Sequence, residues 1–319
     1  MECESLARAE ALAAALTLGS KVKPILMEPG VLIVDTDADP VKLANRLGLC
    51  HHVDEWLSTC EAGELESSAR GLDIEGPIRV RSTKIGELKV DLAGATRRLG
   101  AILGKTRGVD LSSPKSDIRV VFSEHAHIGR AIASIERAAF EKRKNRYMPF
   151  VYPASLHPKF ARALVNLAMT DYGGRLLDPF SGTGAILAEA SMIGLHAIGS
   201  DFSDRMIAGS RTNLTYLKQD AELHLCDVGA IGREIGRVDG IATDPPYGRS
   251  TSTDGEGLPQ LYARAFEAFY GVLRKGAKVA MVVPELKLLE VAKGFHIAGT
   301  HQLRVHRSLT RNFCVLERA

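Results

Sequence analysis

The second half of the chain repeats one pattern. Five short apolar runs, at residues 176–179, 196–201, 223–227, 238–244 and 279–284, alternate with segments of helical spacing. This alternation favours a doubly wound, largely parallel sheet covered by helices, and a last pair of runs (296–306 and 313–317) predicts a closing antiparallel hairpin. Each of the first four runs ends at an aspartate or one residue beyond it. Because such sheets bind ligands at the carboxyl ends of their strands, the pattern predicts a row of carboxylates at one binding edge.

The fourth run continues into Asp244, Pro245, Pro246 and Tyr247. Two prolines remove two backbone donors and fix two φ angles, so the strand must open into a rigid loop. There the Asp244 carboxylate and the Pro245 carbonyl can each accept an N–H, and the Tyr247 ring can stack on a flat base. Two acceptors on an exocyclic amine bias its nitrogen toward a pyramidal geometry and aim its lone pair at an electrophile. These four residues are the predicted catalytic set, and a turn that only ends a strand is the competing interpretation.

A glycine-rich loop follows the first run. Residues 178–184, Asp-Pro-Phe-Ser-Gly-Thr-Gly, precede the helical segment 185–192, and their glycines let the backbone approach a ligand at the amino end of that helix. A dinucleotide-binding loop is the alternative. Two features oppose it: Leu187 replaces the third glycine of GxGxxG, and the Asp178 carboxylate would repel a pyrophosphate. An acidic loop suits S-adenosylmethionine better, because that cofactor is cationic and has no phosphate.

The later strand ends extend this site. Asp201 can accept from both ribose hydroxyls, and Phe202 beside it can cover the adenine. Asp227 can accept from the adenine amino group, with the Val228 N–H available to a ring nitrogen. Helix capping is the alternative for both aspartates. The predicted cofactor residues are Asp178, Phe180, Gly182, Thr183, Gly184, Asp201, Phe202, Asp227 and Val228.

Charge is strongly segregated along the chain. Residues 1–75 carry 6 Lys and Arg against 14 Asp and Glu, whereas residues 76–170 carry 18 against 7. A basic block of this size beside a neutral second half predicts a polyanion partner, for which RNA or DNA is the natural candidate. The predicted RNA-binding residues are Arg79, Arg81, Lys84, Arg97, Arg98, Lys105, Arg107, Lys142 and Arg143.

The first half reads as small units of mixed helix and strand. Helices are predicted at 3–18, 40–49, 91–104 and 159–169, and strands at 31–34, 78–82 and 118–122. Residues 125–146 are interpreted as a helical, strongly basic connector. The proline-punctuated stretch 149–158 after it marks a domain boundary.

Length and composition set further limits. A chain of 319 residues exceeds one usual domain, so at least two cores are expected. No leader pattern or membrane-spanning apolar run is found, and the cytoplasm is the expected compartment. The cysteines (Cys3, Cys50, Cys60, Cys226 and Cys314) have no paired spacing, so no disulfide is expected. Cys50 to Cys60 with two intervening histidines fits no common zinc spacing, and no metal site is predicted.

Several strings resemble known families. Asp244 to Tyr247 is similar to the motif of S-adenosylmethionine-dependent amino-methyltransferases. The segments 97–100, 109–114 and 118–122 resemble the end of a THUMP domain, which binds tRNA near its acceptor end. The second half closely resembles archaeal tRNA guanine-N2 methyltransferases that modify guanine 10. The matching strings are 155–159, 162–167, DPFSGTGAILAEA from Asp178, ATDPPYGRST from Ala242, and 306–311.

The resemblance implies a Rossmann-like methyltransferase sheet preceded by small ferredoxin-like and THUMP domains. The implied divisions are a ferredoxin-like segment at 1–50, THUMP at 51–123, a basic linker at 124–150 and the methyltransferase domain at 151–319. Asp244 and Pro245 would hold the guanine N2, and Arg249, Ser250 and Thr251 would begin a mobile loop through Gly257. The implied partner is tRNA. Some relatives work with a small zinc-binding activator subunit and others alone, and no membrane partner is implied.

Four alternatives stay open at this point. The chain can act on another tRNA or ribosomal RNA position within the same family, or on a DNA amino group, which the THUMP-like segment disfavours. An NAD-dependent oxidoreductase would use the glycine loop differently. A tRNA-binding subunit with a vestigial pocket would be no enzyme, although the intact acidic series argues against it.

Overall fold

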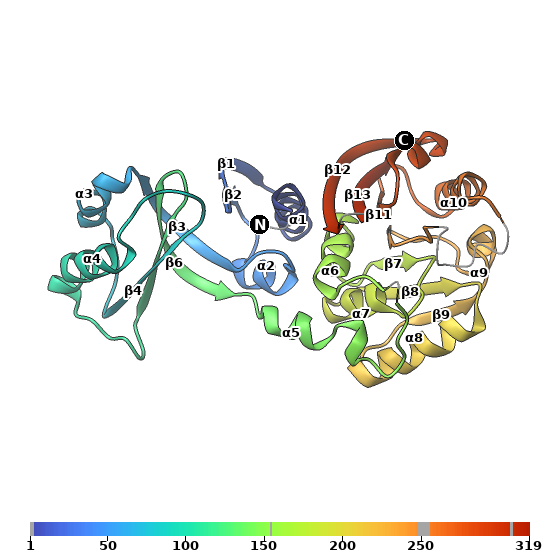
Figure 1. Ribbon diagram of the computed structural model, residues 1–319, viewed down its shortest axis with the longest axis horizontal. Coiled ribbons are helices and arrows are strands. Elements are labelled where there is room, and N and C mark those ends of the chain that lie inside the picture. The colour runs from blue at the N-terminus through green and yellow to red at the C-terminus, as the bar shows by residue number, and fades with distance from the viewer. Residues whose placement is uncertain (1–2, 154, 248–255, 307–308) are drawn as a thin grey trace. The chain divides into compact units, whose positions relative to one another are not determined.

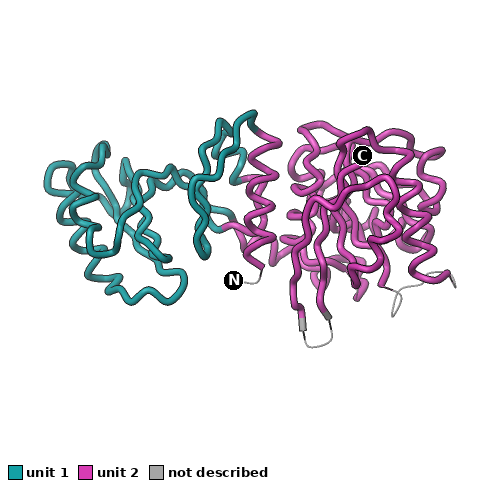
Figure 2. Tube along the Cα trace, turned by 90° about the horizontal axis from the view of Figure 1, so that it is seen from above, with its two compact units in different colours: residues 1, 19–44, 51–135 teal, residues 2–18, 45–50, 136–319 magenta. Residues whose placement is uncertain are grey.

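The computed structural model describes residues 3–153, 155–247, 256–306 and 309–319, and the chain forms two compact units. Unit 1 contains residues 19–44 and 51–135, and unit 2 contains residues 2–18, 45–50 and 136–319 (Figure 2). Unit 1 is thus inserted into the sequence of unit 2. Within the described residues, no helix combines the length and apolar character needed to cross a membrane.

Unit 1 holds an antiparallel hairpin and a four-stranded sheet. The hairpin pairs β1 (Val22–Glu28) with β2 (Val31–Thr36), and α2 (Pro40–Arg46) follows it. The sheet has the order β3-β6-β5-β4, with β4 and β5 parallel and the other neighbours antiparallel. Its elements are β3 (His52–Cys60), η1 (Ala62–Glu64), α3 (Leu65–Arg70), β4 (Ile78–Lys84), α4 (Leu92–Arg107), β5 (Ser116–Phe122) and β6 (Ala126–Ser134).

The core of unit 1 follows from strand alternation. Ile118, Val120 and Phe122 occupy every second position of β5 and are fully buried. They pack with Leu99 and Leu103, which lie one helical turn apart on α4. The helices therefore cover one face of this sheet.

Two expectations about this half are wrong. Residues 1–50 do not form a ferredoxin-like segment of their own, because 2–18 and 45–50 belong to unit 2 and the hairpin belongs to unit 1. Residues 125–146 are not a helical linker throughout, because β6 pairs with β3 on one side and β5 on the other. Only α5 (Arg137–Lys142) is helical there. Pairing with strands distant in sequence overrides the local helical appearance of the segment.

The hairpin is fixed to the four-stranded sheet through a buried carboxylate. Glu28, at the end of β1, binds His125 Nδ1 at 2.6 Å and His127 Nε2 at 2.9 Å. It also accepts from the backbone N–H of Glu124 at 3.0 Å. Burial alone would raise the pKa of Glu28, but these hydrogen bonds hold that pKa below its usual value.

Unit 2 is built on a seven-stranded sheet of order β12-β13-β11-β10-β7-β8-β9. Its strands are β7 (Arg175–Asp178), β8 (His196–Asp201), β9 (Glu222–Leu225), β10 (Gly240–Thr243), β11 (Lys278–Val283), β12 (Phe295–His306) and β13 (Leu309–Arg318). Its helices are α1 (Glu4–Leu18), α5, η2 (Asn145–Tyr147), α6 (Pro158–Leu167), α7 (Ala185–Met192), α8 (Asp204–Leu217), η3 (Val228–Ala230), α9 (Ile231–Glu234), α10 (Leu258–Val272) and η4 (Leu286–Val291).

The predicted parallel sheet with an antiparallel hairpin is confirmed. Strands β9, β8, β7, β10 and β11 are parallel neighbours, and β13 joins β11 antiparallel. The inner parallel strands β8, β7, β10 and β11 are largely buried on both faces, as expected for a sheet covered by helices, whereas the edge strand β9 is only partly buried (Figure 1). On β10, Ala242 packs in the apolar cluster on the face of the sheet covered by α6 and α7. Ile241 packs in the cluster on the opposite face, which α10 covers.

A buried ion-pair cluster joins three helices of unit 2. Glu189 on α7 has a side chain that is 1% exposed, and it pairs with Arg143 and Arg162 at 2.8 Å each. Arg162 on α6 also donates to the carbonyl of Asn45 at 3.0 Å. A buried carboxylate and guanidinium depend on each other, because either charge left alone would be strongly desolvated.

Glu189→Gln keeps the volume of the side chain and removes its charge. We expect a loss of about 3–5 kcal/mol in the free energy of unfolding of unit 2, because Arg162 is left buried without its counter-charge. The measurement is urea denaturation. Glu234→Gln is the control, since its ion pair with Arg233 is exposed and should be worth only ~0–1 kcal/mol. Equal losses in the two variants would contradict the importance of the cluster.

Candidate functional site

The glycine loop connects β7 to α7 through left-handed backbone. Gly182 has φ +48° and Gly184 has φ +81°, a region that residues with a Cβ avoid. Gly184 is also close-packed: a Cβ there would lie 2.4 Å from Ser210 Oγ. Phe180 in the same loop is half-buried against the core on the α10 side of the sheet. Both glycines thus have backbone conformations that favour glycine, and their role in holding a cofactor stays a prediction.

Asp178 ends β7 and joins two loops. Its Oδ1 accepts from Thr243 Oγ1 at 2.7 Å and from the Phe180 N–H at 3.2 Å. Burial raises its pKa to about 7, and the nearby charges of Asp244 and Asp201 add to the shift. Because Thr243 is the last residue of β10, this hydrogen bond ties the glycine loop to the strand that carries the predicted catalytic residues.

Asp201 ends β8 and faces the same loop. Its Oδ2 accepts from the Gly182 N–H at 3.1 Å, and its Oδ1 accepts from the Ser203 N–H at 2.9 Å. Burial raises its pKa as well. Phe202 next to it is 50% exposed, which leaves an aromatic face beside the carboxylate. Because both oxygens of Asp201 accept backbone N–H groups, its role as ribose acceptor and that of Phe202 as base cover stay predictions.

Asp227 is engaged by a residue that sequence analysis did not single out. Arg264 on α10 binds its Oδ1, and the Gly229 N–H donates to the same oxygen at 2.8 Å. Burial would raise the pKa of Asp227, but the hydrogen bond and charge of Arg264 hold it below its usual value. Arg264 also binds Glu256 at 2.7 Å. Val228, the other residue predicted here, is buried at the start of η3.

Asp244 leaves β10 at the same edge. Its Oδ1 accepts from the Tyr247 hydroxyl at 2.7 Å. Burial raises the pKa of Asp244 to about 6, and the positive charge of Arg311 works against that shift. Pro245 is buried and Pro246 half-buried. The Tyr247 ring packs partly against the core on the α6 side, so its stacking on a base stays a prediction.

Part of the predicted site cannot be placed. Arg249, Ser250 and Thr251, the start of the predicted mobile loop, fall within residues 248–255, outside the described residues. Residues 307–308 of the string 306–311 are also outside them. The described residues predicted for catalysis and cofactor binding lie at or after the carboxyl ends of β7, β8, β9 and β10, one edge of the parallel sheet.

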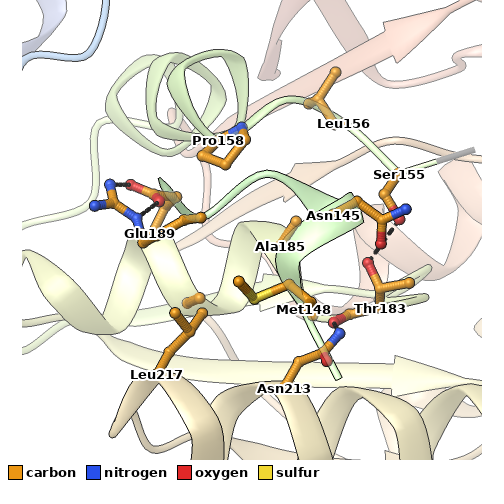
Figure 3. A pocket seen from close by; sticks show the side chains of 13 residues that line it. Asn145, Met148, Ser155, Leu156, Pro158, Thr183, Ala185, Glu189, Asn213 and Leu217 are labelled. Atoms are coloured by element: carbon orange, nitrogen blue, oxygen red, sulfur yellow. Dashed lines mark hydrogen bonds and ion pairs between the residues drawn. The ribbon is translucent and has the colours of Figure 1, made fainter. Parts of the chain in front are cut away.

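A second anchor of the glycine loop comes from α8 and from the stretch before α6. Asn213 donates to the carbonyls of Thr183 and Phe150 at 3.0 Å each and accepts from the Phe150 N–H at 2.9 Å. Ser155 Oγ lies 2.9 Å from Thr183 Oγ1. Figure 3 shows Ser155 and Asn213 near Thr183, and Glu189 across the same small cavity. Sequence analysis missed Asn213 because nothing local distinguishes it.

The predicted RNA-binding residues divide into two groups. Six have exposed side chains, namely Arg81, Lys84, Arg97, Arg98, Lys105 and Lys142. Arg79 and Arg81 share the carboxylate of Asp117, and Arg98 pairs with Glu66 at 2.8 Å on the surface. The exposed pair of Arg98 with Glu66 can exchange for phosphate, whereas the Asp117 side chain that binds Arg79 and Arg81 is only 15% exposed. RNA binding by these seven residues stays a prediction.

Arg107 and Arg143 have structural roles instead, contrary to the prediction. Arg107 donates to the carbonyls of Ile74 at 2.7 Å and Leu72 at 2.9 Å. Arg143 is bound to the buried carboxylate of Glu189. If either guanidinium moved to bind a phosphate, the protein groups that it now binds would lose their partners. The free-energy cost of those unpaired buried groups would oppose the phosphate contact.

Comparison with known proteins agrees with this geometry. Residues 145–312 match a family model described as "RMKL-like, methyltransferase domain". The tRNA (guanine(10)-N2)-dimethyltransferase of Methanothermobacter thermautotrophicus is 36% identical, with coverage of 91% of this chain and 89% of the relative. This chain belongs to the same family. The enzyme of that name from Pyrococcus abyssi is 34% identical, with coverage of 92% and 91%.

A solved structure supports the assignment of this methyltransferase. The crystal structure of TrmN from Thermus thermophilus is similar with a TM-score of 0.53 and 25% identity, over 99% of this chain and 96% of that one. The likeness extends over both units of the chain, so it is not confined to the Rossmann-like sheet.

Gly184→Ala tests the glycine loop. The added methyl group would meet Ser210 and force an unfavourable φ, so we expect the loop to distort and the rise in melting temperature on adding S-adenosylmethionine to disappear. Gly271→Ala is the matched control, because Gly271 is within α10 with no atom within 4 Å of an added Cβ. It should stabilise the protein by roughly 0.5–1 kcal/mol and keep the ligand response. An unchanged response in Gly184→Ala would refute the predicted cofactor loop.

Proposed function

We propose that this protein transfers methyl groups from S-adenosylmethionine to the exocyclic N2 of guanine 10 in tRNA, giving N2-methylguanosine, N2,N2-dimethylguanosine or both. The observation that carries the proposal is the joining of two loops by the Thr243 to Asp178 hydrogen bond. It places a glycine loop suited to a cationic cofactor beside the Asp244 loop suited to an amine. The family assignment supplies the substrate class.

The residues present fit S-adenosylmethionine. In the loop that would hold the cofactor, Gly184 has no room for a Cβ. The carboxylates of Asp178 and Asp201 accept hydrogen bonds from the backbone of that loop. The buried hydroxyls of Ser181 and Ser210 have no hydrogen-bond partner in the described chain, so polar capacity remains around the loop. The bound cofactor would supply an electrophilic methyl group on a sulfonium. Phe202 and Asp227 would hold its adenosine end.

The chain's own groups prepare the amine. Asp244, in its ionised form, accepts one N–H of the guanine N2, and the carbonyl of Pro245 accepts the other. These two acceptors draw the nitrogen toward a pyramidal geometry and direct its lone pair out of the base plane. The Tyr247 hydroxyl, which now binds Asp244, must turn aside or share that carboxylate when the base enters.

Unit 1 would deliver the tRNA. Its exposed basic residues on β4 and α4 can contact phosphates without reading sequence, which gives affinity and orientation. Guanine 10 lies in a paired stem, so the nucleotide must be extruded at a cost of a few kcal/mol, which the phosphate contacts offset. Whether a small zinc-binding activator subunit assists is decided by assaying the protein alone. Mapping the modified nucleoside distinguishes guanine 10 from other positions.

Asp244→Ala should reduce methylation by roughly 100-fold or more, because a positioned acceptor of this kind is worth that much in the transition state. Binding of tRNA should be nearly unchanged, since the affinity comes from phosphate contacts. The assay uses labelled S-adenosylmethionine and unmodified tRNA, with nucleoside analysis and a guanine-10 substitution as the substrate control. Asp220→Ala, at an exposed loop position, should keep full activity. Near-normal turnover by Asp244→Ala would refute the assigned role.

The same carboxylate predicts the pH dependence. Burial raises the pKa of Asp244 to about 6, and only its ionised form can accept from the amine. The kcat/KM for tRNA, measured at saturating cofactor, should therefore fall as the pH drops below about 6 and should level off above pH 6. Because Asp178 titrates near 7, cofactor affinity is measured separately across the same range. A flat profile from pH 5.5 to 8 would contradict this assignment.

A further inference from the structure

Arg311 lies beside the catalytic loop although it comes from the last strand. In the sheet, Thr243 of β10 pairs with Met281 of β11, and Asn312 of β13 pairs with Val283, the last residue of β11. Arg311 precedes Asn312, so it pairs with Leu303 of β12 but lies one residue beyond the pairing of β13 with β11, at the edge where β10 ends and its loop begins. This is the binding edge of the parallel strands.

Strand alternation places Arg311 on the α6 side of the sheet. Phe313, two residues after Arg311, and Leu303, its pairing partner on β12, both pack in the apolar cluster of that side. Tyr247 packs against the same cluster, and its hydroxyl binds Asp244.

The backbone below Arg311 is rigidly held. Asn312 donates from Nδ2 to the carbonyls of Val283 and Pro284 at 3.1 Å each. These bonds fix the start of β13 against the end of β11. Because the backbone next to it is held in this way, Arg311 can present its guanidinium in a defined position, as a group that recognises a ligand requires.

The guanidinium of Arg311 is close to the catalytic carboxylate but not paired with it. Its charge acts on both Asp244 and Tyr247. Within the described residues, however, no ion pair or hydrogen bond joins Arg311 to Asp244. Among the described residues, its buried Nε has no hydrogen-bond partner, and an acceptor on a bound ligand would relieve the cost of that unpaired donor.

Guanine offers acceptors at the required place. Its N2 and N1 are donors on one edge, and its O6 and N7 are acceptors farther around the ring. A base whose N2 is held by Asp244 therefore turns O6 and N7 away from that carboxylate. The planar fork of arginine matches these two acceptors and is the commonest reader of guanine in proteins.

We propose that Arg311 determines base specificity by donating to O6 and N7 of the guanine whose N2 is held by Asp244. This inference rests on the proposed function and names the recognition contact within it. Adenine lacks both the N2 amine and O6, and it presents a donor where Arg311 also donates. The contact thus rejects adenine and orients guanine for transfer.

The experiment compares two tRNAs that differ only at position 10, one with guanine and one with 2,6-diaminopurine. Diaminopurine keeps the N2 amine and replaces O6 with a second amine. The wild-type protein should prefer guanine by roughly 10- to 100-fold in kcat/KM, the range expected for one bidentate contact. Arg311→Gln should lose that preference and act on both tRNAs at similarly low rates.

Arg311→Lys separates recognition from charge. Lysine keeps the positive charge that acts on Asp244 but lacks the planar fork. We expect it to keep the wild-type pH profile of methylation while discriminating poorly between the two bases. Arg304→Gln is the matched control, since Arg304 is an exposed arginine on the neighbouring strand β12, and it should discriminate like wild type. Thermal unfolding with and without S-adenosylmethionine verifies that each variant is folded and binds cofactor.

The outcomes are distinguishable. If both Arg311 variants slow equally on the two tRNAs and keep the wild-type preference, Arg311 acts only through the charge of Asp244 and the inference is overturned. If the wild-type protein methylates neither tRNA at position 10, the proposed function itself fails. Loss of preference in both variants with a retained pH profile in Arg311→Lys supports the inference.

Discussion

The hydrogen bond from Thr243 to Asp178 is the contact on which the rest of the site depends. It joins the ends of β10 and β7, two parallel neighbours whose loops have different tasks. One loop has backbone that only glycine adopts easily, and the other is stiffened by two prolines. Without a fixed relation between them, a cofactor and a base bound separately would have no reason to meet at reacting distance.

The same edge concentrates negative charge at the expense of stability. Asp178, Asp201 and Asp244 are desolvated together, and each has a pKa raised above its ordinary value. Such an arrangement is unfavourable in the free protein and becomes favourable when a cationic ligand arrives. The charge of Arg311 moderates this cost at Asp244, and the hydrogen bond from Thr243 moderates it at Asp178. Under the proposed function, a cationic cofactor bound at this edge would offset that cost.

Sequence reasoning succeeded where the signal is local. The strand ends at Asp178, Asp201, Asp227 and Asp244 were located because an apolar run followed by an acidic residue is visible in a short window. It failed where a partner is remote. Strand β6 is defined by pairing with β3, more than 60 residues earlier, and Arg143 is committed to Glu189, 46 positions away. Neither Arg264 nor Arg311 carries a local mark of the carboxylate it influences.

Unit 2 is assembled from three separate stretches of chain, and its first piece is α1. The fully buried Leu6 and Ala14 on this helix belong to a unit whose largest stretch, residues 136–319, is synthesised only after all of unit 1. During synthesis, the apolar side chains of α1 therefore stay exposed while unit 1 emerges from the ribosome and folds. Unit 2 can complete its core only after α6 has been synthesised, so the insertion of unit 1 delays the folding of unit 2.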